Sequence, residues 1–116
     1  MNVFLWVVQI LLAVAFVAAG AGKLTQPKEK LQPRMPYVEE YSQQQLRGIG
    51  ALEVLGALGL VLPWATGIAP VLTPIAAAGL GITMIVAAQV HRRRKESFAV
   101  NLVLLAMAVV VAVGRI

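Results

Sequence analysis

The chain has 116 residues, of which 59% are hydrophobic and only 13% charged, and its formal net charge is +5. A water-soluble domain of this length needs more polar surface to cover its core, so the composition indicates one domain that is surrounded by lipid. The sequence contains no cysteine, which excludes disulfides, thiolate metal ligands and a cysteine nucleophile.

The first apolar segment runs from Val3 to Gly22, is interrupted only by Gln9, and ends at Lys23. About 20 apolar residues at about 1.5 Å per residue span a hydrocarbon core of about 30 Å. A cleaved secretory signal would begin with basic residues, and no basic residue precedes Lys23. We therefore predict a retained membrane-spanning helix over about 3–23.

A polar connection with three prolines follows at residues 24–45. Within it, a short interfacial helical segment is predicted over about 36–45, because Pro36 suits the first turn of a helix.

Three further apolar segments predict helices over about 46–63, 70–91 and 97–114. Pro63 ends the first of these, since proline lacks the N–H that continues a helix. A compact basic turn at residues 91–96 separates the last two.

The predicted fold is all-α: a bundle of four transmembrane helices that forms one integral membrane domain over residues 1–116. Every backbone polar group must be bonded inside the hydrocarbon, which favours helices. A transmembrane β-barrel would show alternation of apolar and polar residues, and these segments are continuously apolar.

The basic residues lie at one end of the predicted bundle. Nine of the ten flank or fill the two connections 24–45 and 91–96, and Arg115 alone belongs to the other end. The nine are Lys23, Lys28, Lys30, Arg34, Arg47, Arg92, Arg93, Arg94 and Lys95. The positive-inside rule predicts that both connections are cytoplasmic and both termini extracytoplasmic. Topology thus accounts for the charge without a nucleic-acid partner.

Glu53 is the most informative polar residue, because it lies about 10 Å into the second predicted helix, counted from Leu46. A charged carboxylate at that depth costs about 2.5 kcal/mol or more, so it should face a partner or a cavity. Gly50, Gly56 and Ala57 share its helical face, and small residues let another helix approach closely. We expect Glu53 to point into the bundle, as a structural ion pair or as a ligand-facing or proton-handling group.

Lys23 is the expected partner of Glu53, because the first two helices are antiparallel and the lysine stem can reach along the membrane normal. Arg47 lies on the same helix as Glu53 but points about 120° away from it. The alternative role for Lys23 is an anchor at the membrane interface.

Three other polar residues are expected near this depth: Gln89 and His91 at the end of the third helix, and Asn101 in the fourth. Alternatively, His91 is an interfacial residue beside the arginines, and the side chains of Gln89 and Asn101 form hydrogen bonds between helices. The convergence of polar residues from all four helices favours a pocket of Lys23, Glu53, Gln89, His91 and Asn101 in the cytoplasmic half.

The opposite half of the bundle is expected to be almost purely apolar, with Gln9 as its one polar residue. Trp6 and Trp64 are expected near the interface on that side, where amphipathic indoles are common.

Known catalytic motifs are absent from the sequence. It contains no phosphate-binding loop, no zinc-binding histidine pair and no plausible serine-histidine-acid set. The sequence has only one histidine, which excludes haem held by two histidines. One histidine and one embedded acid also cannot form a closed metal site. No catalytic residue is predicted, and a role as an enzyme is not favoured.

Four segments resemble the DoxX-like family in order and spacing, and together they cover nearly the whole chain. They are residues 18–24 (AAGAGKL), 35–38 (MPYV), 50–60 (GALEVLGALGL) and 101–105 (NLVLL). The resemblance implies a four-helix bacterial membrane protein whose polar family positions fall on Lys23, Glu53, His91 and Asn101. It also implies a link to quinone-dependent sulfur oxidation and membrane oxidoreductase complexes. The chain has no cysteine pair or cofactor motif, which argues against independent redox catalysis.

The leading hypothesis is a non-enzymatic accessory subunit of the bacterial cytoplasmic membrane. It would bind a small lipophilic molecule, such as a quinone, near Glu53 and Lys23 and support a membrane oxidoreductase. The alternatives are a proton-coupled exporter of small molecules and a purely structural scaffold. The expected protein partners are further copies of the chain or an oxidoreductase subunit. A cavity beside Glu53 would favour the ligand hypothesis.

Overall fold

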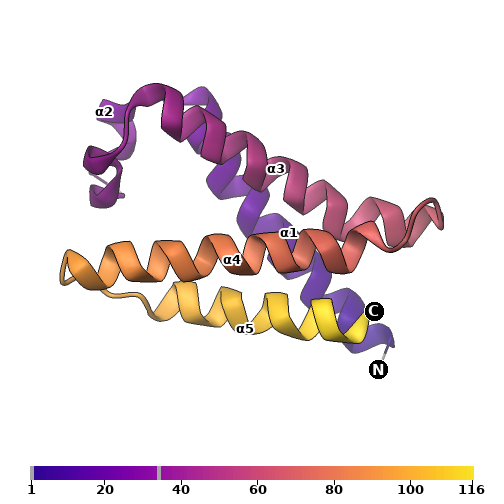
Figure 1. The fold of residues 1–116 in the computed structure, drawn as a ribbon. Coiled ribbons are helices and arrows are strands. Elements are labelled where there is room, and N and C mark those ends of the chain that lie inside the picture. The colour runs from indigo at the N-terminus through magenta and orange to yellow at the C-terminus, as the bar shows by residue number, and fades with distance from the viewer. Residues whose placement is uncertain (1, 34) are drawn as a thin grey trace.

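The computed structural model describes all residues except Met1 and Arg34, and the described chain is almost entirely helical (Figure 1). Its elements are α1 (Asn2–Thr25), α2 (Lys28–Leu31), the 3-10 helix η1 (Pro36–Glu40), α3 (Gln43–Thr66), α4 (Leu72–Arg93) and α5 (Ala99–Gly114). Arg34, one of the cations counted for topology, lies outside the described residues.

Three of the helices, α1, α3 and α4, are long and apolar enough to cross a membrane. The fourth apolar helix, α5, has 16 residues and is about 24 Å long, shorter than the hydrocarbon core of about 30 Å. It begins at Ala99, two residues later than predicted, and its N-cap residue Phe98 makes no side-chain capping bond. The prediction of an all-helical membrane protein is confirmed, with three helices of spanning length and a shorter fourth.

The four apolar helices form a closed ring in which α1 packs on α3, α3 on α4, α4 on α5, and α5 on α1. Both termini and the α3–α4 turn lie at one end, and α2 and the α4–α5 connection lie at the other (Figure 1). Arg94 joins the two basic connections, because its guanidinium donates to the carbonyl of Pro36 and pairs with Glu39. Most of the positive charge is therefore at one end, which we call the basic end.

The segment predicted to be interfacial, residues 36–45, is only partly a separate helix. Pro36–Glu40 forms η1, Tyr41 is extended, and α3 then starts at Gln43, earlier than predicted. The early start has a local cause: Ser42 and Gln45 form a capping box, in which each side chain bonds the other's backbone N–H.

Helix α3 continues past its predicted end at Pro63, to Thr66, and is closed by Gly67 with a φ of 73°. Proline removes the N–H that would bond the carbonyl of Gly59, four residues earlier. That carbonyl accepts a hydrogen bond from the hydroxyl of Thr73 on α4 at 3.2 Å instead. The proline is tolerated because a neighbouring helix supplies the missing donor.

Replacing Thr73 by valine should lower the free energy of unfolding by about 1–3 kcal/mol, because the partly buried Gly59 carbonyl loses the donor that the buried threonine supplies. Adding Pro63→Ala should restore most of that loss, since alanine returns the backbone N–H. Denaturation in mild detergent measures both variants. Equal stability of Thr73→Val and the wild type would contradict this account.

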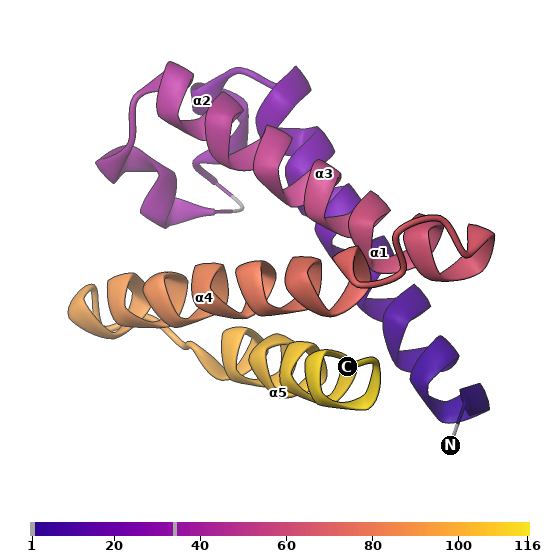
Figure 2. The ribbon, with the colours of Figure 1, turned by 45° about the vertical axis from the view of Figure 1, so that its right-hand side comes forward.

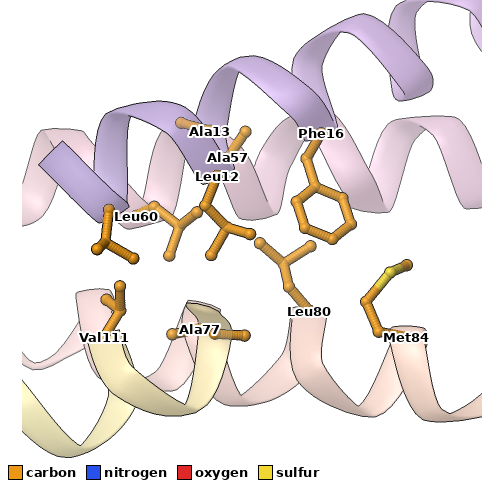
Figure 3. Packing of buried hydrophobic residues seen from close by; sticks show 11 residues of the cluster. Leu12, Ala13, Phe16, Ala57, Leu60, Ala77, Leu80, Met84 and Val111 are labelled. Carbon is orange, nitrogen blue, oxygen red and sulfur yellow. The ribbon is translucent and has the colours of Figure 1, made fainter. Parts of the chain in front are cut away.

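The main hydrophobic core lies between the four apolar helices (Figure 3). Its largest fully buried side chains include Phe16 and Leu12 from α1, Leu60 from α3 and Val111 from α5. A second cluster of Leu31, Val38 and Leu46 holds α2 and η1 against the start of α3. The outer faces carry exposed valine, leucine and isoleucine side chains, as expected for helices that contact lipid.

Candidate functional site

Helices α1 and α3 are in backbone contact at a pair of glycines. A Cβ atom on Gly20 would lie 2.6 Å from the carbonyl oxygen of Gly50, and a Cβ on Gly50 would lie 2.6 Å from that of Gly20. Only glycine permits this approach, which agrees with the small-residue face expected around Glu53. Lys23 and Glu53 each lie three residues after one of these glycines, so the close approach brings their side chains together.

The Lys23 ammonium donates a hydrogen bond to Oε1 of Glu53 at 2.6 Å, and the two groups form an ion pair. Lys23 is 5% exposed and Glu53 is 2% exposed. The pair that the sequence predicted is therefore present, and it is buried inside the bundle. Burial of two opposite charges gives little net stability by itself, but removing one partner would leave the other uncompensated.

A cavity of about 360 Å³ lies beside this pair, and we call it the inner cavity. Residues of α1, α3, α4 and α5 line it, together with Tyr41, which precedes α3. Its polar lining residues are Lys23, Tyr41, Glu53, Thr83 and Asn101. Its apolar lining residues are Ala15, Phe16, Ala19, Ile49, Leu52, Ile82, Met84, Val86, Ala87 and Leu104. The inner cavity is thus an apolar space with polar groups at a few points, as is typical of small-molecule sites.

The inner cavity exists because the helix pairs diverge. The α1–α3 pair and the α4–α5 pair meet near the termini and separate toward the basic end (Figure 2). Ala15, Ala19 and Ala87 line the space between them, and their short side chains do not fill it.

Asn101 lines the same cavity as Lys23 and Glu53. Its Nδ2 atom lies 3.6 Å from the sulfur of Met84, which is a weak acceptor. The contact with Met84 therefore gives the Asn101 amide only a weak hydrogen bond.

Gln89 and His91 do not line the inner cavity. Gln89 is exposed, because it is rotated by about 140° on α4 from the cavity-lining Met84. His91 shares the face of Met84 but lies about 10 Å further along α4. Its Nδ1 atom is 3.0 Å from Oε1 of Glu96, in the α4–α5 connection. The predicted polar set thus divides into three residues that converge and two that do not.

Two polar residues of the cavity wall were not predicted. Tyr41, an extended residue shortly before α3, lines the wall, and so does Thr83 of α4. The Thr83 hydroxyl donates to the carbonyl of Gly79 in its own helix, so it presents mainly its methyl group and oxygen lone pairs. A threonine in an apolar helix gives no sequence signal for such a role.

The expectation of an almost purely apolar opposite half needs correction. Gln9 is fully buried there, and its Nε2 donates to the carbonyl of Leu60 at 2.6 Å. Its Oε1 accepts a hydrogen bond of 2.7 Å from Nε of Arg115, which is also buried. A second polar cluster therefore lies at the end that carries the termini.

Comparison with known proteins identifies a family for this chain. The profile described as the DoxX-like family matches residues 7–113, which include every residue of the inner cavity. No curated protein and no solved structure matches the chain.

Proposed function

The chain belongs to the DoxX-like family, and from its inner cavity we propose that it binds a small lipophilic molecule with a hydrogen-bonding head group, such as a quinone. In this proposal it is a non-enzymatic membrane protein that supports a membrane oxidoreductase system. The observation that carries the proposal is the apolar cavity directly beside the buried Lys23–Glu53 pair.

The chemistry of the cavity wall suits the carbonyl groups of such a molecule. Carbonyl oxygens accept hydrogen bonds, and both Lys23 and Asn101 carry donors at the wall. An ammonium group has three donor hydrogens, so it can serve more than one acceptor. Glu53 holds the ammonium in place and neutralises it. A lysine without this partner would leave an uncompensated charge in the bundle.

The size of the inner cavity is also suitable. Its volume of about 360 Å³ lies within the range of about 300–1,000 Å³ that is usual for small-molecule sites. Phe16, Leu52 and Leu104 offer apolar contacts to a ring or a short chain. A polar head at Lys23 and an apolar body along these side chains would satisfy both parts of the wall.

The membrane placement that supports this function is a multi-pass protein of the bacterial cytoplasmic membrane, with both basic connections in the cytoplasm. It rests on the excess of lysine and arginine at one end. The link from Arg94 to Pro36 and Glu39 supports it, since it holds both connections together at that end.

Filling the inner cavity should remove the bound molecule while leaving the ion pair intact. Ala19→Leu adds bulk at the cavity wall, and Ala18→Leu makes the same change at an exposed neighbour on α1. We expect retention of the lipophilic molecule to fall at least about tenfold in Ala19→Leu, equivalent to about 1.4 kcal/mol, and to be unchanged in Ala18→Leu. Native mass spectrometry and solvent extraction of the purified proteins measure it.

The same preparation separates the alternatives. A wild-type protein that carries no small molecule, but a stoichiometric protein partner, would replace the proposal by the scaffold hypothesis. Substrate-dependent proton movement in liposomes that is lost in Glu53→Gln would replace it by the exporter hypothesis.

A further inference from the structure

Arg115 is the C-cap residue of α5, next to the C-terminal end of the chain, and it is only 5% exposed. Its Nε donates to Oε1 of Gln9 at 2.7 Å, and its Nη1 donates to Oδ1 of Asn2 at 2.8 Å. Both acceptors are neutral amides. They satisfy donor atoms of the guanidinium but do not compensate its charge.

Two tryptophans also contact this guanidinium. Its central carbon lies 4.5 Å from the centroid of the Trp64 ring and 5.5 Å from that of Trp6. These cation–π contacts stabilise the positive charge without adding a negative one. Tryptophan is also enriched at the level of the lipid headgroups, so the two rings place Arg115 near that level.

No carboxylate among the described residues forms an ion pair with Arg115. The acidic side chains of the sequence are Glu29, Glu39, Glu40, Glu53 and Glu96. All of these belong to the helices and connections of the basic end or to the inner cavity. The Nη2 atom of Arg115 is buried and has no hydrogen-bond partner. An arginine is always charged, and a buried charge without a counter-ion is strongly unfavourable.

Arg115 lines a cleft of about 520 Å³, which we call the outer cleft. Its other lining residues are Trp64, Pro70 and Val71 around the α3–α4 turn, Pro74, Ile75 and Ala78 of α4, Ala112 of α5, and Ile116. Arg115 is the one charged side chain among the described residues that line it. The apolar walls continue into the lipid-facing surface of α4, because Ile75 is 58% exposed.

We propose that the outer cleft binds an anionic phospholipid of the surrounding bilayer, with its phosphate at Arg115. The Arg115 guanidinium lines the cleft and has a donor, Nη2, that no group among the described residues uses, and guanidinium–phosphate pairs are strong and directional. One acyl chain lies along Ile75 and Ala78 of α4. A small soluble anion would leave these apolar walls without contacts, whereas a phospholipid fills both the charged and the apolar parts of the cleft.

The test is the binding of phosphatidylglycerol to the full chain in detergent, measured by native mass spectrometry with phosphatidylcholine as the neutral-headgroup comparison. We expect one phosphatidylglycerol retained by the wild type, and at least about tenfold weaker retention in Arg115→Gln. Arg92→Gln removes an exposed cation at the basic end and should bind as the wild type does.

Because Arg115→Gln also removes buried hydrogen bonds, a second variant keeps the test valid if that variant unfolds. Ala78→Phe fills the outer cleft and leaves the contacts of Arg115 unchanged. It should also lose phosphatidylglycerol, while Ile85→Phe, an exposed position of α4 outside the cleft, should not. Equal retention in all variants, or equal retention of phosphatidylcholine, would overturn the proposal. So would a wild type that holds a free fatty acid, or that binds phosphatidylglycerol only after amidation of the C-terminal carboxylate.

Discussion

Replacing Glu53 by alanine is expected to lower the free energy of unfolding by about 3–5 kcal/mol. The ammonium of Lys23 would remain buried with its partner removed, and the bundle offers it little water. The cost follows from the uncompensated charge rather than from the net strength of the ion pair. Unfolding in mixed micelles with increasing denaturing detergent, followed by helical circular dichroism, measures the change.

The matched control removes both charges. Lys23→Met combined with Glu53→Leu replaces the pair by apolar groups of similar length and should be within about 1 kcal/mol of the wild type, or more stable. A stable double variant that no longer retains the lipophilic molecule would separate the ligand role of the pair from its structural role. If the double variant were as unstable as Glu53→Ala, the account of the pair would be wrong.

Replacing Gly50 by alanine is expected to destabilise the bundle by about 1–3 kcal/mol. The new Cβ atom would lie 2.6 Å from the backbone carbonyl oxygen of Gly20 and 2.9 Å from Cβ of Lys23, and neither is the flexible end of a side chain. Helices α1 and α3 would have to separate, which would also disturb the Lys23–Glu53 pair. Thermal unfolding in detergent measures the stability.

Gly48→Ala is the control for this prediction, because it makes the same change two residues earlier on α3. A Cβ atom at Gly48 would meet nothing within 4 Å. This variant should be as stable as the wild type or gain up to about 1 kcal/mol from the better helix propensity of alanine. Similar effects of the two substitutions would show that the close approach of α1 and α3 is unimportant.

The helices could be predicted from local sequence composition, and the central ion pair from the antiparallel arrangement of the first two helices. Long apolar segments can be recognised from composition. A carboxylate and an ammonium are each costly alone in a membrane, so two such groups at the same depth are expected to pair. Glu53 and Lys23 lie at the same level of two antiparallel helices. Their pairing followed from topology and from the small residue Gly50 one turn away.

Other features depend on contacts between distant segments and could not be predicted. Pro63 looked like a helix end, because the hydroxyl that replaces its missing donor comes from Thr73 on the next helix. The exclusion of Gln89 depends on which face of α4 meets the inner cavity, and that of His91 depends on how far α4 extends past it. Helical periodicity does not determine that distance.

The burial of Arg115 illustrates the same limit most clearly. The sequence predicts for Arg115 only that it is the one basic residue at the end that carries the termini. Its burial depends on Asn2, Gln9 and Trp64, which lie at least 51 residues away in the sequence. The divergence of the helix pairs, and with it the inner cavity, is likewise a property of the packed bundle.

The most direct test of the inner cavity as a ligand site is the equilibrium binding of a short-chain benzoquinone to the protein in lipid nanodiscs. We predict saturable binding of one molecule per chain to the wild type and to Ala18→Leu. Affinity should be at least about tenfold weaker for Ala19→Leu and for the Lys23→Met, Glu53→Leu double variant. Binding to the wild type that never saturates and equals partition into empty nanodiscs would contradict the account.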